Sequence, residues 1–465
     1  MAFQTHPSLT AGPVLFLFDA SLVAVAWPVM AAQATRWLPA EAQPSLLQLL
    51  VFAAAYLLLL YALGLYRRDA LLETRKSLVR VPLAAALGGV LALAVLTLMP
   101  APHAGTATAS LFGAAMLCFM TVGFAARIAL FLLRRYGAFR RRLLVVGAGR
   151  RAWDIRWLVG KEGRTLAFEI VFVHDASMGA VDPRLAADPA NRILPAAEGF
   201  LAIARRCGAD EIVVAPDERR GIAMESLLAC RTAGYPVYEY LRFLEKEIGR
   251  VDLKRMEFGW LLYAEGFSFG LVDRALKRAL DILASAAVLL AASPLLLAAA
   301  AAVRLHDGGP VLYRQTRVTQ EGRTFRIMKL RTMAIDAERG GAVWAVQRDP
   351  RVTPVGRFLR RTRLDELPQL LNILKGDMSF VGPRPERPEF IGELAAKLPL
   401  YNERHLVKAG LTGWAQVNYP YGASLDDARS KLSYDLYYVK NFGVLFDVLI
   451  ILQTLRVVLW PGGVR

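Results

Sequence analysis

Two adjacent carboxylates, Asp365 and Glu366, directly follow residues 357–363, a stretch that contains four arginines. Pro368 suits the first turn of a helix and biases the residue before it away from the helical region, so we expect a helix boundary or break at about 365–367. A helix N-terminus favours negative charge, which would keep Asp365 ionised and let a phosphate bind beside it. An ionised aspartate can attack phosphorus, and its neighbour can hold a Mg²⁺ ion that bridges phosphate oxygens. The same residues also fit a plain helix start, with Asp365 as N-cap, Glu366 as a first-turn acid and the arginines as a solvated or lipid-facing stripe.

Two further loops carry side chains that suit phosphate or nucleotide binding. Residues 376–388 are rich in proline, which lowers the entropy cost of ordering a loop, and they present Arg384 and Arg387 for bidentate phosphate contacts. Residues 408–418 form a glycine-containing turn whose polar side chains could contact phosphate, ribose or base: Lys408, Thr412 and Gln416. Taken alone, each loop is explained more simply as an ordinary turn.

The N-terminal part of the chain has the composition of a membrane domain. The chain is 55% hydrophobic, and four apolar runs cover residues 14–32, 46–65, 79–99 and 110–133. Each run is close to or above the ~20 residues that cross a bilayer core as a helix. Four basic residues lie between the second and third runs, a fifth, Arg80, lies at the start of the third, and five follow the fourth, so the positive-inside rule places both ends of a four-helix transmembrane bundle, residues 1–133, in the cytoplasm. Asp19 and Arg127 lie inside the runs, where a charge has either a function or a packing role.

A basic linker, residues 134–142, leads to a segment with the pattern of a Rossmann-like α/β domain, residues 143–267. Apolar runs of strand length alternate with helical patterns, which predicts a parallel sheet. Gly147 and Gly149 follow the first strand in a sequence that fits the G-x-G-x-x-G/A fingerprint, in which a pyrophosphate lies at a helix N-terminus. Asp175 only loosely meets the spacing of the acidic residue expected ~20 positions later. A tight turn in a domain that binds nothing or regulates is the simpler interpretation.

The third part of the chain begins with an apolar stretch, residues 279–303, that is long enough to span a membrane. Ser293 and Pro294 lie at its centre, where proline removes one helical hydrogen bond and a kink or break is expected. Basic residues flank both ends, which disagrees with a simple crossing. We therefore predict a re-entrant membrane helix over residues 271–305, with a kinked fifth span as the alternative, and a mostly α-helical domain over residues 306–465. The net charge of +17 favours anionic partners such as lipid headgroups and nucleotide phosphates.

Six segments of this third part together resemble one protein family: residues 313–318, 325–333, 363–369, 376–379, 381–385 and 411–417. In this order and at these spacings they are similar to the bacterial sugar transferase family, whose members are monotopic phosphoglycosyl transferases. The preceding bundle and Rossmann-like domain are similar to the long form of the family, which initiates exopolysaccharide, capsule or O-antigen synthesis.

The resemblance implies a reaction for residues 306–465, which would be the catalytic domain. A hexose 1-phosphate would pass from a UDP-sugar to polyprenyl phosphate, with release of UMP and a covalent phosphosugar on Asp365. Glu366, with Asp365, would hold Mg²⁺, and Ser293 with Pro294 would form the break of the re-entrant helix. Glucose and galactose are the sugars expected by family habit.

The resemblance also implies binding residues and a location. Arg384 falls on the family's Pro-Arg-Pro element, which contacts phosphate. From their residue types we also expect Lys329, Arg331, Arg363 and Arg387 to bind phosphate, and Lys408, Thr412 and Gln416 to contact the nucleotide. Ala409 departs from the family, which often has proline there. The protein would be a multi-pass protein of the bacterial inner (cytoplasmic) membrane, surrounded by membrane lipids, with its catalytic domain facing the cytoplasm. Its oligomeric state is open, with a homodimer as one option.

Three other functions are alternatives to sugar-phosphate transfer, and two of them lack the sequence features that they require. A non-enzymatic membrane regulator would sense a nucleotide through its Rossmann-like domain and would tolerate Asp365→Asn. A nucleic-acid binder would need aromatic residues interleaved with basic ones on a soluble module, whereas here the basic residues lie beside predicted membrane helices, so we expect no nucleic-acid partner. A processive glycosyltransferase usually binds its metal through an Asp-x-Asp element, and the chain contains none.

Overall fold

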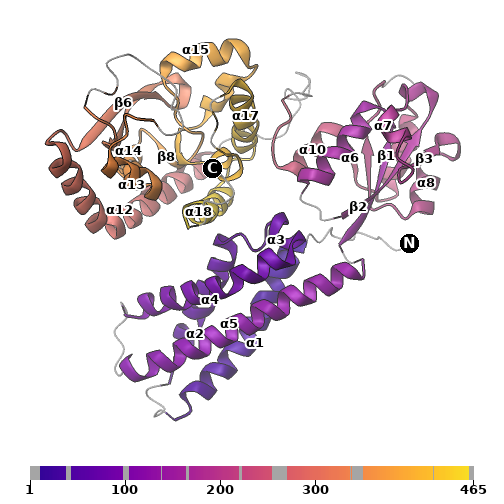
Figure 1. Cartoon of the computed structure of the whole chain (residues 1–465). Helices are drawn as coiled ribbons and strands as arrows, with labels where there is room; N and C mark the ends of the chain where they lie inside the picture. The colour runs from indigo at the N-terminus through magenta and orange to yellow at the C-terminus, as the bar shows by residue number, and fades with distance from the viewer. Residues whose placement is uncertain are drawn as a thin grey trace. The chain divides into compact units, whose positions relative to one another are not determined.

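The computed structural model describes residues 11–37, 43–97, 104–137, 139–163, 167–218, 222–253, 270–335, 337, 349–420, 422 and 424–459. The chain divides into two compact units, Met1–Gly249 and Arg250–Arg465 (Figure 1). Residues 250–253 therefore go with the second unit, although the sequence assigned them to a Rossmann-like domain that ends at 267. Residues 254–267 of that predicted domain lie outside the described residues.

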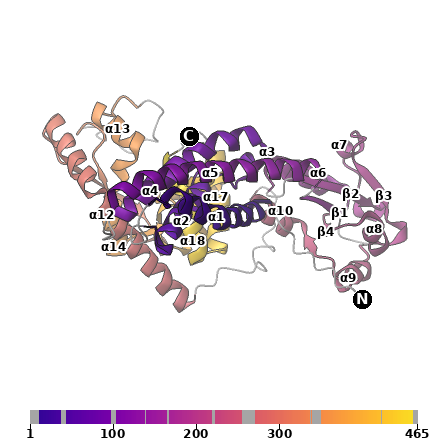
Figure 2. The same ribbon diagram turned by 90° about the horizontal axis from the view of Figure 1, so that it is seen from below.

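The first unit begins with a helical bundle built from the four apolar runs. Its helices are α1 (Ala11–Thr35), α2 (Leu46–Ala62), the short α3 (Arg68–Leu72), α4 (Thr74–Thr97) and α5 (Ala104–Arg135). The four long helices lie side by side in both views (Figures 1 and 2) and bury an apolar core around Trp27, Tyr56 and Phe119. By length and composition, Ala11–Thr35, Ser77–Ala94 and Ala109–Arg135 are able to cross a membrane. The 17 residues of α2 are at the lower limit for a span, since 1.5 Å per residue gives a length of ~26 Å.

Asp19 and Arg127, the two charges predicted inside the apolar runs, are partners of each other. Arg127 Nη1 lies 2.6 Å from Asp19 Oδ1, and Tyr66 Oη donates a hydrogen bond of 2.8 Å to Asp19 Oδ2. Both charged side chains are almost fully buried, so the pair joins α1 to α5 inside the bundle. Removing either partner would leave an uncompensated buried charge. A structural role in joining the two helices is therefore enough to explain why both residues are present.

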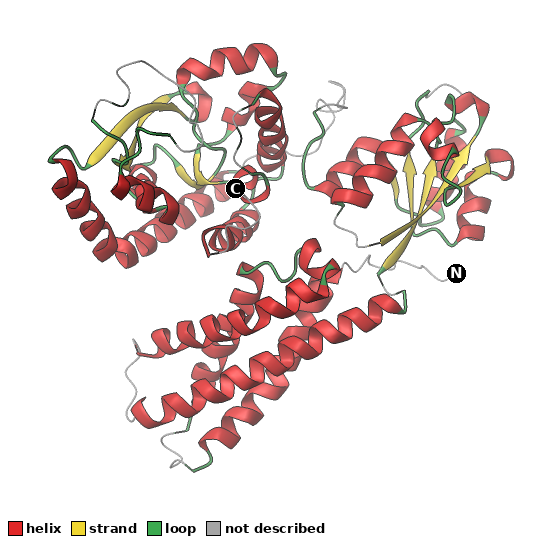
Figure 3. Cartoon of the chain, in the orientation of Figure 1, coloured by secondary structure: helices red, strands yellow, loops and turns green. Residues whose placement is uncertain are grey.

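The rest of the first unit is built on a five-stranded parallel sheet, as the alternation of strands and helices predicts. The strands are β1 (Arg140–Val146), β2 (Ala167–His174), β3 (Arg192–Pro195), β4 (Glu211–Val214) and β5 (Val237–Glu239), in the order β3-β2-β1-β4-β5. Helices cover both faces of the sheet (Figure 3): α6 (Arg150–Glu162), α7 (Pro183–Ala186), α8 (Phe200–Cys207), α9 (Met224–Thr232) and α10 (Tyr240–Ile248), with the short turns η2 (Ala176–Met178) and η3 (Ala196–Glu198). The apolar residues 143–146 of β1 are buried because a parallel sheet is covered on both sides. Residues 140–142 of the predicted linker belong to β1.

One long helix, α12 (Leu271–Asp307), dominates the start of the second unit. It contains Ser293 and Pro294, and it bends along its length rather than separating into two helices (Figure 1). Proline has no N–H, so the carbonyl of Leu290, four residues earlier, loses its helical donor. Ser293 Oγ donates to that carbonyl at 2.8 Å, which keeps the helix continuous. The helix is long and apolar enough to cross a membrane, and much of its apolar surface is exposed, including Leu283, Leu290, Leu295 and Leu297.

A small mixed domain surrounds part of α12. The predicted hairpin is present as β6 (Leu312–Val318) and β7 (Thr324–Leu330), and β8 (Ser379–Val381) pairs in parallel with β9 (Gly410–Thr412). The other helices are α13 (Pro354–Thr362), α14 (Gln369–Lys375), α15 (Pro388–Lys397), α16 (Trp414–Asn418), α17 (Leu425–Lys440) and α18 (Val444–Leu459), with the 3₁₀ turns η4 (Gln320–Gly322), η5 (Leu364–Glu366) and η6 (Tyr401–Leu406). Their apolar core includes Leu370, Met378, Trp414 and Tyr438. The domain is mostly helical, as predicted.

Three buried charged residues, called here the anchoring cluster, fasten α12 to this domain: Lys277, Asp281 and Asp447. Lys277 Nζ lies 2.6 Å from Asp447 Oδ2 and 3.3 Å from Asp281 Oδ1, and it donates to the carbonyl of Val381 at 3.0 Å. Both aspartates also accept hydrogen bonds, Asp281 from β8 and Asp447 from α17. The N-terminal half of α12 is thus fixed against β8, α17 and α18.

Candidate active site

Asp365 and Glu366 lie in the short turn η5, between α13 and α14. Arg363, just before this turn, has a φ of 60°, a left-handed conformation that residues other than glycine rarely adopt. Pro368 is the N-cap of α14, which begins at Gln369. The break predicted at about 365–367 is therefore present, and the two carboxylates lie between two helices rather than in the first turn of one.

Glu366 is held by three cations from three segments of the second unit. Its Oε1 lies 3.1 Å from Lys329 Nζ on β7 and 3.0 Å from Arg384 Nη2, and its Oε2 lies 3.8 Å from Arg363 Nη1. Burial by itself would raise the pKa of Glu366, but the charges of Lys329, Arg384 and Arg363 hold this pKa well below its ordinary value. The fold thus brings three of the predicted phosphate-binding residues to one ionised carboxylate.

Asp365 is buried beside this ion-paired glutamate. It is 7% exposed, and among the described residues its Oδ1 has no hydrogen-bond partner. Burial, and after it the negative charge of Glu366, raises the pKa of Asp365 to about 6, against the opposing charges of Lys329, Arg360 and Arg363. Asp365 is still mostly ionised at pH 7, as predicted, but the predicted cause, stabilisation of its charge by a helix N-terminus, is wrong. The residue lies in a buried turn, so desolvation outweighs any benefit from a helix N-terminus.

The proline-rich loop carries Arg384 toward Glu366 and Arg387 toward α15. Arg317 Nη1 donates to the loop carbonyl of Pro385 at 3.2 Å, which fixes the loop against β6. The guanidinium of Arg387 lies 5.9 Å from the ring centre of Phe390. Burial, together with the nearby charges of Arg384 and Arg387, lowers the pKa of Arg317. Positive charge is therefore concentrated on this side of Glu366.

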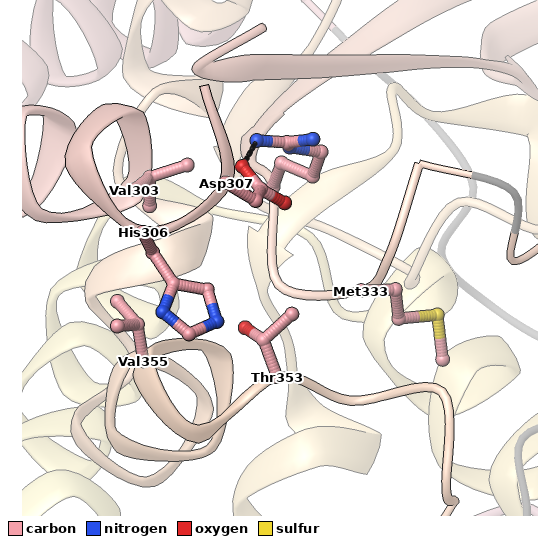
Figure 4. A pocket seen from close by; sticks show the side chains of 7 residues that line it. Val303, His306, Asp307, Met333, Thr353 and Val355 are labelled. Carbon is pink, nitrogen blue, oxygen red and sulfur yellow. Dashed lines mark hydrogen bonds and ion pairs between the residues drawn. The ribbon is translucent and has the colours of Figure 1, made fainter. Parts of the chain in front are cut away.

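Arg331 lies apart from these residues, at the end of α12. Figure 4 shows the shallow depression that it lines together with Val303, His306, Asp307, Met333, Thr353 and Val355. Arg331 Nη2 forms an ion pair with Asp307, and within the described part of the chain its Nε and Nη1 have no hydrogen-bond partner. The contacts of Arg331 thus join β7 to α12, and they do not include the carboxylates of η5.

Comparison with known proteins gives a family for the second unit. Residues 272–461 match the family described as bacterial sugar transferase. A UDP-N-acetylgalactosamine-undecaprenyl-phosphate N-acetylgalactosaminephosphotransferase of Aeromonas hydrophila is 41% identical over 252 residues, which make up 54% of this chain and 58% of the relative. A UDP-glucose:undecaprenyl-phosphate glucose-1-phosphate transferase of Escherichia coli is 43% identical over 185 residues, 39% of this chain and 40% of the relative. The exopolysaccharide production protein PSS of Rhizobium leguminosarum bv. phaseoli is 41% identical over 192 residues, which make up 39% of this chain and 94% of that protein.

The chain belongs to the bacterial sugar transferase family. The match to the Rhizobium protein covers nearly all of that relative, whereas the chain spans about three-fifths of the Aeromonas protein and two-fifths of the Escherichia protein. The Aeromonas match is longer than residues 272–461, so the similarity extends upstream of residue 272. The resemblance read from the six segments is confirmed.

In this sugar transferase, the three residues predicted to contact a nucleotide make contacts with α14, β9 and α18. Lys408 Nζ donates to the carbonyl of Gly376, the C-cap of α14, at 2.8 Å. Thr412 Oγ1 lies 2.7 Å from Thr454 Oγ1 on α18. Gln416 Nε2 donates to Leu411 O at 3.0 Å. These contacts hold the 408–418 loop in place, and a nucleotide-binding role for the three residues stays a prediction.

Glycine in this loop serves close packing rather than flexibility. A Cβ atom on Gly410 would collide with the backbone of Gly382, the residue that follows β8. A Cβ atom on Gly382 would in turn collide with the carbonyl of Lys408. The proline-rich loop and the 408–418 loop can therefore run this close together only because both positions are glycine.

Two cations near the site escaped the sequence analysis. Arg360 Nε donates to Thr332 Oγ1 at 2.8 Å, and its charge lowers the pKa of Asp365. Arg360 belongs to the arginine-rich stretch, which pointed to it only as one of four equivalent residues. Lys431, on α17, interacts electrostatically with Glu386 and Arg384. No local pattern marks Lys431, because only the fold brings α17 to the proline-rich loop.

Proposed function

We propose that this sugar transferase moves a sugar 1-phosphate from a UDP-sugar to polyprenyl phosphate, giving polyprenyl diphosphate sugar and UMP. The observation that carries the proposal is the buried Asp365, whose Oδ1 has no partner in the described structure, within a concentration of cations. Two carboxylates are surrounded here by four cations: Lys329, Arg360, Arg363 and Arg384. The positive charge in excess would be balanced by a diphosphate. The names of the relatives, which include undecaprenyl phosphate and a UDP-sugar, agree with this pair of substrates.

The reaction follows from the free oxygen of Asp365. Oδ1 attacks the phosphorus that bears the sugar, and the bond from this phosphorus to the oxygen of UMP breaks. The products of this step are UMP and a sugar phosphate bound to Asp365 as a mixed anhydride. An oxygen of polyprenyl phosphate then attacks the same phosphorus, the anhydride bond breaks, and the Asp365 carboxylate is regenerated.

Glu366 and its cations prepare the site for phosphate. Lys329 and Arg384 share Oε1 of Glu366, so the carboxylate holds both cations close to Asp365 before substrate arrives. Fixed cations of this kind stabilise the charge that develops on a transferring phosphoryl group. Glu366 is therefore an organising residue for the phosphate-binding cations as well as a candidate metal ligand.

Mg²⁺ fits this site as a partner of the donor. Glu366 offers Oε2 and Asp365 would offer the oxygen that is not the nucleophile, and Mg²⁺ commonly binds to one or two carboxylates together with substrate phosphates. Within the described ranges, no group of three or more His, Cys, Asp or Glu could hold a metal. We expect Asp365, Glu366 and the diphosphate to bind Mg²⁺ jointly, and the ion to neutralise phosphate charge.

The membrane arrangement that we propose brings this site to the lipid acceptor. The bend of α12 at Ser293 and Pro294 and the basic residues at both of its ends support a helix that enters one leaflet and returns. A cytoplasmic second unit would meet UDP-sugar in water and polyprenyl phosphate at the inner-membrane surface. Labelling of Glu389→Cys, placed on the exposed side of α15 in a cysteine-free background, should occur only after the cells are permeabilised. Labelling in intact cells would contradict this orientation.

A covalent phosphosugar on Asp365 is the decisive test of the reaction. Purified protein given UDP-glucose, UDP-galactose or UDP-N-acetylgalactosamine and Mg²⁺, without lipid, should gain the mass of one sugar phosphate from its own donor. Asp365→Asn should gain nothing, while Asp426→Asn, the same change at an exposed aspartate of α17, should behave as wild type. Chelation of Mg²⁺ should stop the mass gain. If the wild type forms no adduct with any donor, or if Asp365→Asn still forms one, the proposal fails.

A further inference from the structure

Arg404, in η6, lies directly behind the loop that carries Arg384. Its side chain is 5% exposed, and its Nη2 forms an ion pair with Asp435 Oδ2 on α17 at 2.8 Å. Arg404 Nη1 donates to Tyr401 Oη at 2.8 Å. Nη2 also donates to the backbone carbonyl of Arg384 at 2.9 Å. The guanidinium therefore joins α17, η6 and the proline-rich loop.

Arg404 contacts the backbone carbonyl of Arg384, and the side chain of Arg384 can therefore reach Glu366. Arg384 Nη2 lies 3.0 Å from Glu366 Oε1. A shift of the Arg384 carbonyl would move the Cα of Arg384 and change the approach of its guanidinium to Glu366. Arg404 thus contacts Arg384, which is itself one of the cations proposed to bind phosphate.

Apolar packing and charged groups around Arg404 hold its side chain in place. Tyr401 belongs to an apolar cluster formed with Val251, Leu394, Leu398, Leu432 and Leu436. Val251 N donates to Ser433 O at 3.1 Å, so residues directly after the division between the two units are part of this support. Charged groups that face Arg404 include Glu386, in the proline-rich loop, and Asp435. The guanidinium is buried, balanced and held from several sides.

We propose that Arg404 is a positioning residue for the transfer reaction: it fixes the backbone of Arg384 so that the Arg384 guanidinium meets Glu366 and the donor phosphates. This inference rests on the proposed function. It adds a residue that the sequence analysis did not mark, and it gives the Asp435–Arg404 pair a role in activity as well as in folding.

A double-mutant cycle between Arg404 and Arg384 tests this inference. Arg404→Lys keeps a positive charge for Asp435 but cannot span Asp435, Tyr401 and the Arg384 carbonyl at once. In the full-length protein it should slow adduct formation about tenfold, mainly through a higher KM for the UDP-sugar, with little change in Tm. In an Arg384→Ala background the same change should have almost no further effect, because the side chain that Arg404 positions is gone.

Two control variants and the cycle itself separate positioning from a merely structural role. Arg429→Lys, at an exposed ion pair of α17, should have no effect, and Tyr401→Phe, which keeps two of the three Arg404 contacts, should have at most a twofold effect. If Arg404→Lys and Arg384→Ala act additively, Arg404 does not work through Arg384 and the inference is overturned. If wild-type protein forms no adduct at all, the proposed function fails first, and the two failures are distinguishable.

A second, independent observation concerns the glycine loop between β1 and α6. Asp217, which follows β4, accepts two hydrogen bonds from the first turn of α6: Arg150 N donates to Oδ2 at 2.7 Å and Arg151 N to Oδ1 at 3.0 Å. Gly149 is the N-cap of α6, and a Cβ atom there would collide with the Asp217 carboxylate. The backbone amides that hold a pyrophosphate in dinucleotide-binding domains are therefore occupied by a side chain of this chain.

We infer that Asp217 is a built-in anionic ligand of this loop, which lets the sheet domain fold with a dinucleotide fingerprint and without a dinucleotide. Hydrogen–deuterium exchange of a peptide covering residues 147–153 in the full-length protein reads the two amides directly. Exchange should be slow in the wild type and unchanged by NAD⁺. In Asp217→Ala it should be at least tenfold faster and should slow again with sulfate, whereas Asp188→Ala, at an exposed loop, should match the wild type. Protection of the wild-type peptide by NAD⁺, or unchanged or sulfate-insensitive exchange in Asp217→Ala, would overturn the inference.

Discussion

The second unit contains two buried clusters of carboxylates and cations that use similar residues in opposite ways. In the anchoring cluster, Asp281 and Asp447 share the single cation Lys277, and hydrogen bonds from β8 and α17 supply the rest. Around η5, Asp365 and Glu366 face more cations than they can balance, and Asp365 Oδ1 has no partner in the described structure. Both carboxylates of the first cluster lie within ion-pair distance of Lys277, whereas in the described structure Asp365 Oδ1 has neither a hydrogen bond nor an ion pair, and the excess of positive charge around it leaves room for an anion. A buried carboxylate is thus informative about function when one of its oxygens lacks both kinds of partner, not when it is merely buried.

The largest effect should come from Asp365→Asn, which separates activity from stability. Adduct formation should fall by more than about 10³-fold, because the nucleophile is lost. Burial and Glu366 raise the pKa of Asp365 to about 6, so its ionised form costs folding free energy on the order of 3 kcal/mol at pH 7. The amide removes that cost, and thermal unfolding in detergent should show an unchanged or higher Tm. A variant that loses both activity and stability would mean that Asp365 is a structural residue like Asp447.

Lys277→Met should show the reverse signature in the anchoring cluster. It leaves two buried aspartates without their cation, and breaking a buried pair in this way costs about 3–5 kcal/mol. The midpoint of thermal unfolding should fall sharply, and any residual folded protein should still form the adduct. The matched control is Lys397→Met, which removes a cation from an exposed pair with Glu393 at the same helical spacing and should cost less than about 1 kcal/mol. Equal losses in the two variants would contradict the difference drawn between buried and exposed pairs.

The pH dependence of adduct formation should follow the raised pKa of Asp365. Since attack requires the carboxylate, the rate should fall as pH drops through about 6, to about a tenth of its plateau one unit lower. The sign for stability is opposite. An acid whose pKa rises on folding, here from 3.8 to about 6, holds more protons in the folded state, so its contribution becomes less favourable as pH rises across that window.

Glu366→Gln sharpens this pH test. The negative charge of Glu366 raises the pKa of Asp365, and removing it while Lys329, Arg360 and Arg363 remain should lower that pKa. When each profile is scaled to its own plateau, the acidic limb should therefore move to lower pH in single-turnover measurements. Asp377→Asn, outside η5, should leave the limb in place. A limb that stays near pH 6 in Glu366→Gln would mean that another group controls the profile.

Local patterns were enough to predict much of the fold and the centre of the site. Hydrophobic length marked the helices of the bundle, alternation marked the parallel sheet, and the Ser293–Pro294 pair marked the bend of α12. Asp365 and Glu366 stood out because they are adjacent and follow an arginine-rich stretch. In each case the physical cause lies within a few residues of the signal.

Long-range partners could not be predicted in this way. Nothing near Asp19 indicates Arg127, more than a hundred residues later, as its partner, and the same is true of Arg404 with Asp435 and of Asp217 with the α6 amides. The burial of Asp365 also depends on the whole domain, which is why the sign of its pKa shift was missed. The partner of a charge is decided by tertiary packing, and a single sequence carries little trace of it.

The smallest expected effect tests the bend that lies between the two ends of α12. Ser293→Ala removes the hydroxyl that donates to the Leu290 carbonyl, the acceptor freed by Pro294, and should cost about 1 kcal/mol of folding free energy. Ser285→Ala is the matched control on the same helix, since within the described residues the Ser285 hydroxyl has no hydrogen-bond partner, and it should be neutral in the same lipid nanodiscs. The anchoring cluster holds only the N-terminal half of α12, so a looser bend should disturb the far half more. Faster hydrogen exchange over residues 295–307, with residues 271–285 unchanged, is the pattern we expect, because the far half is held only by its apolar packing on Leu330 and Leu359 and by the partly exposed Asp307–Arg331 ion pair within the described residues. An equal increase of exchange in both halves would contradict the expectation that the two halves of α12 respond independently.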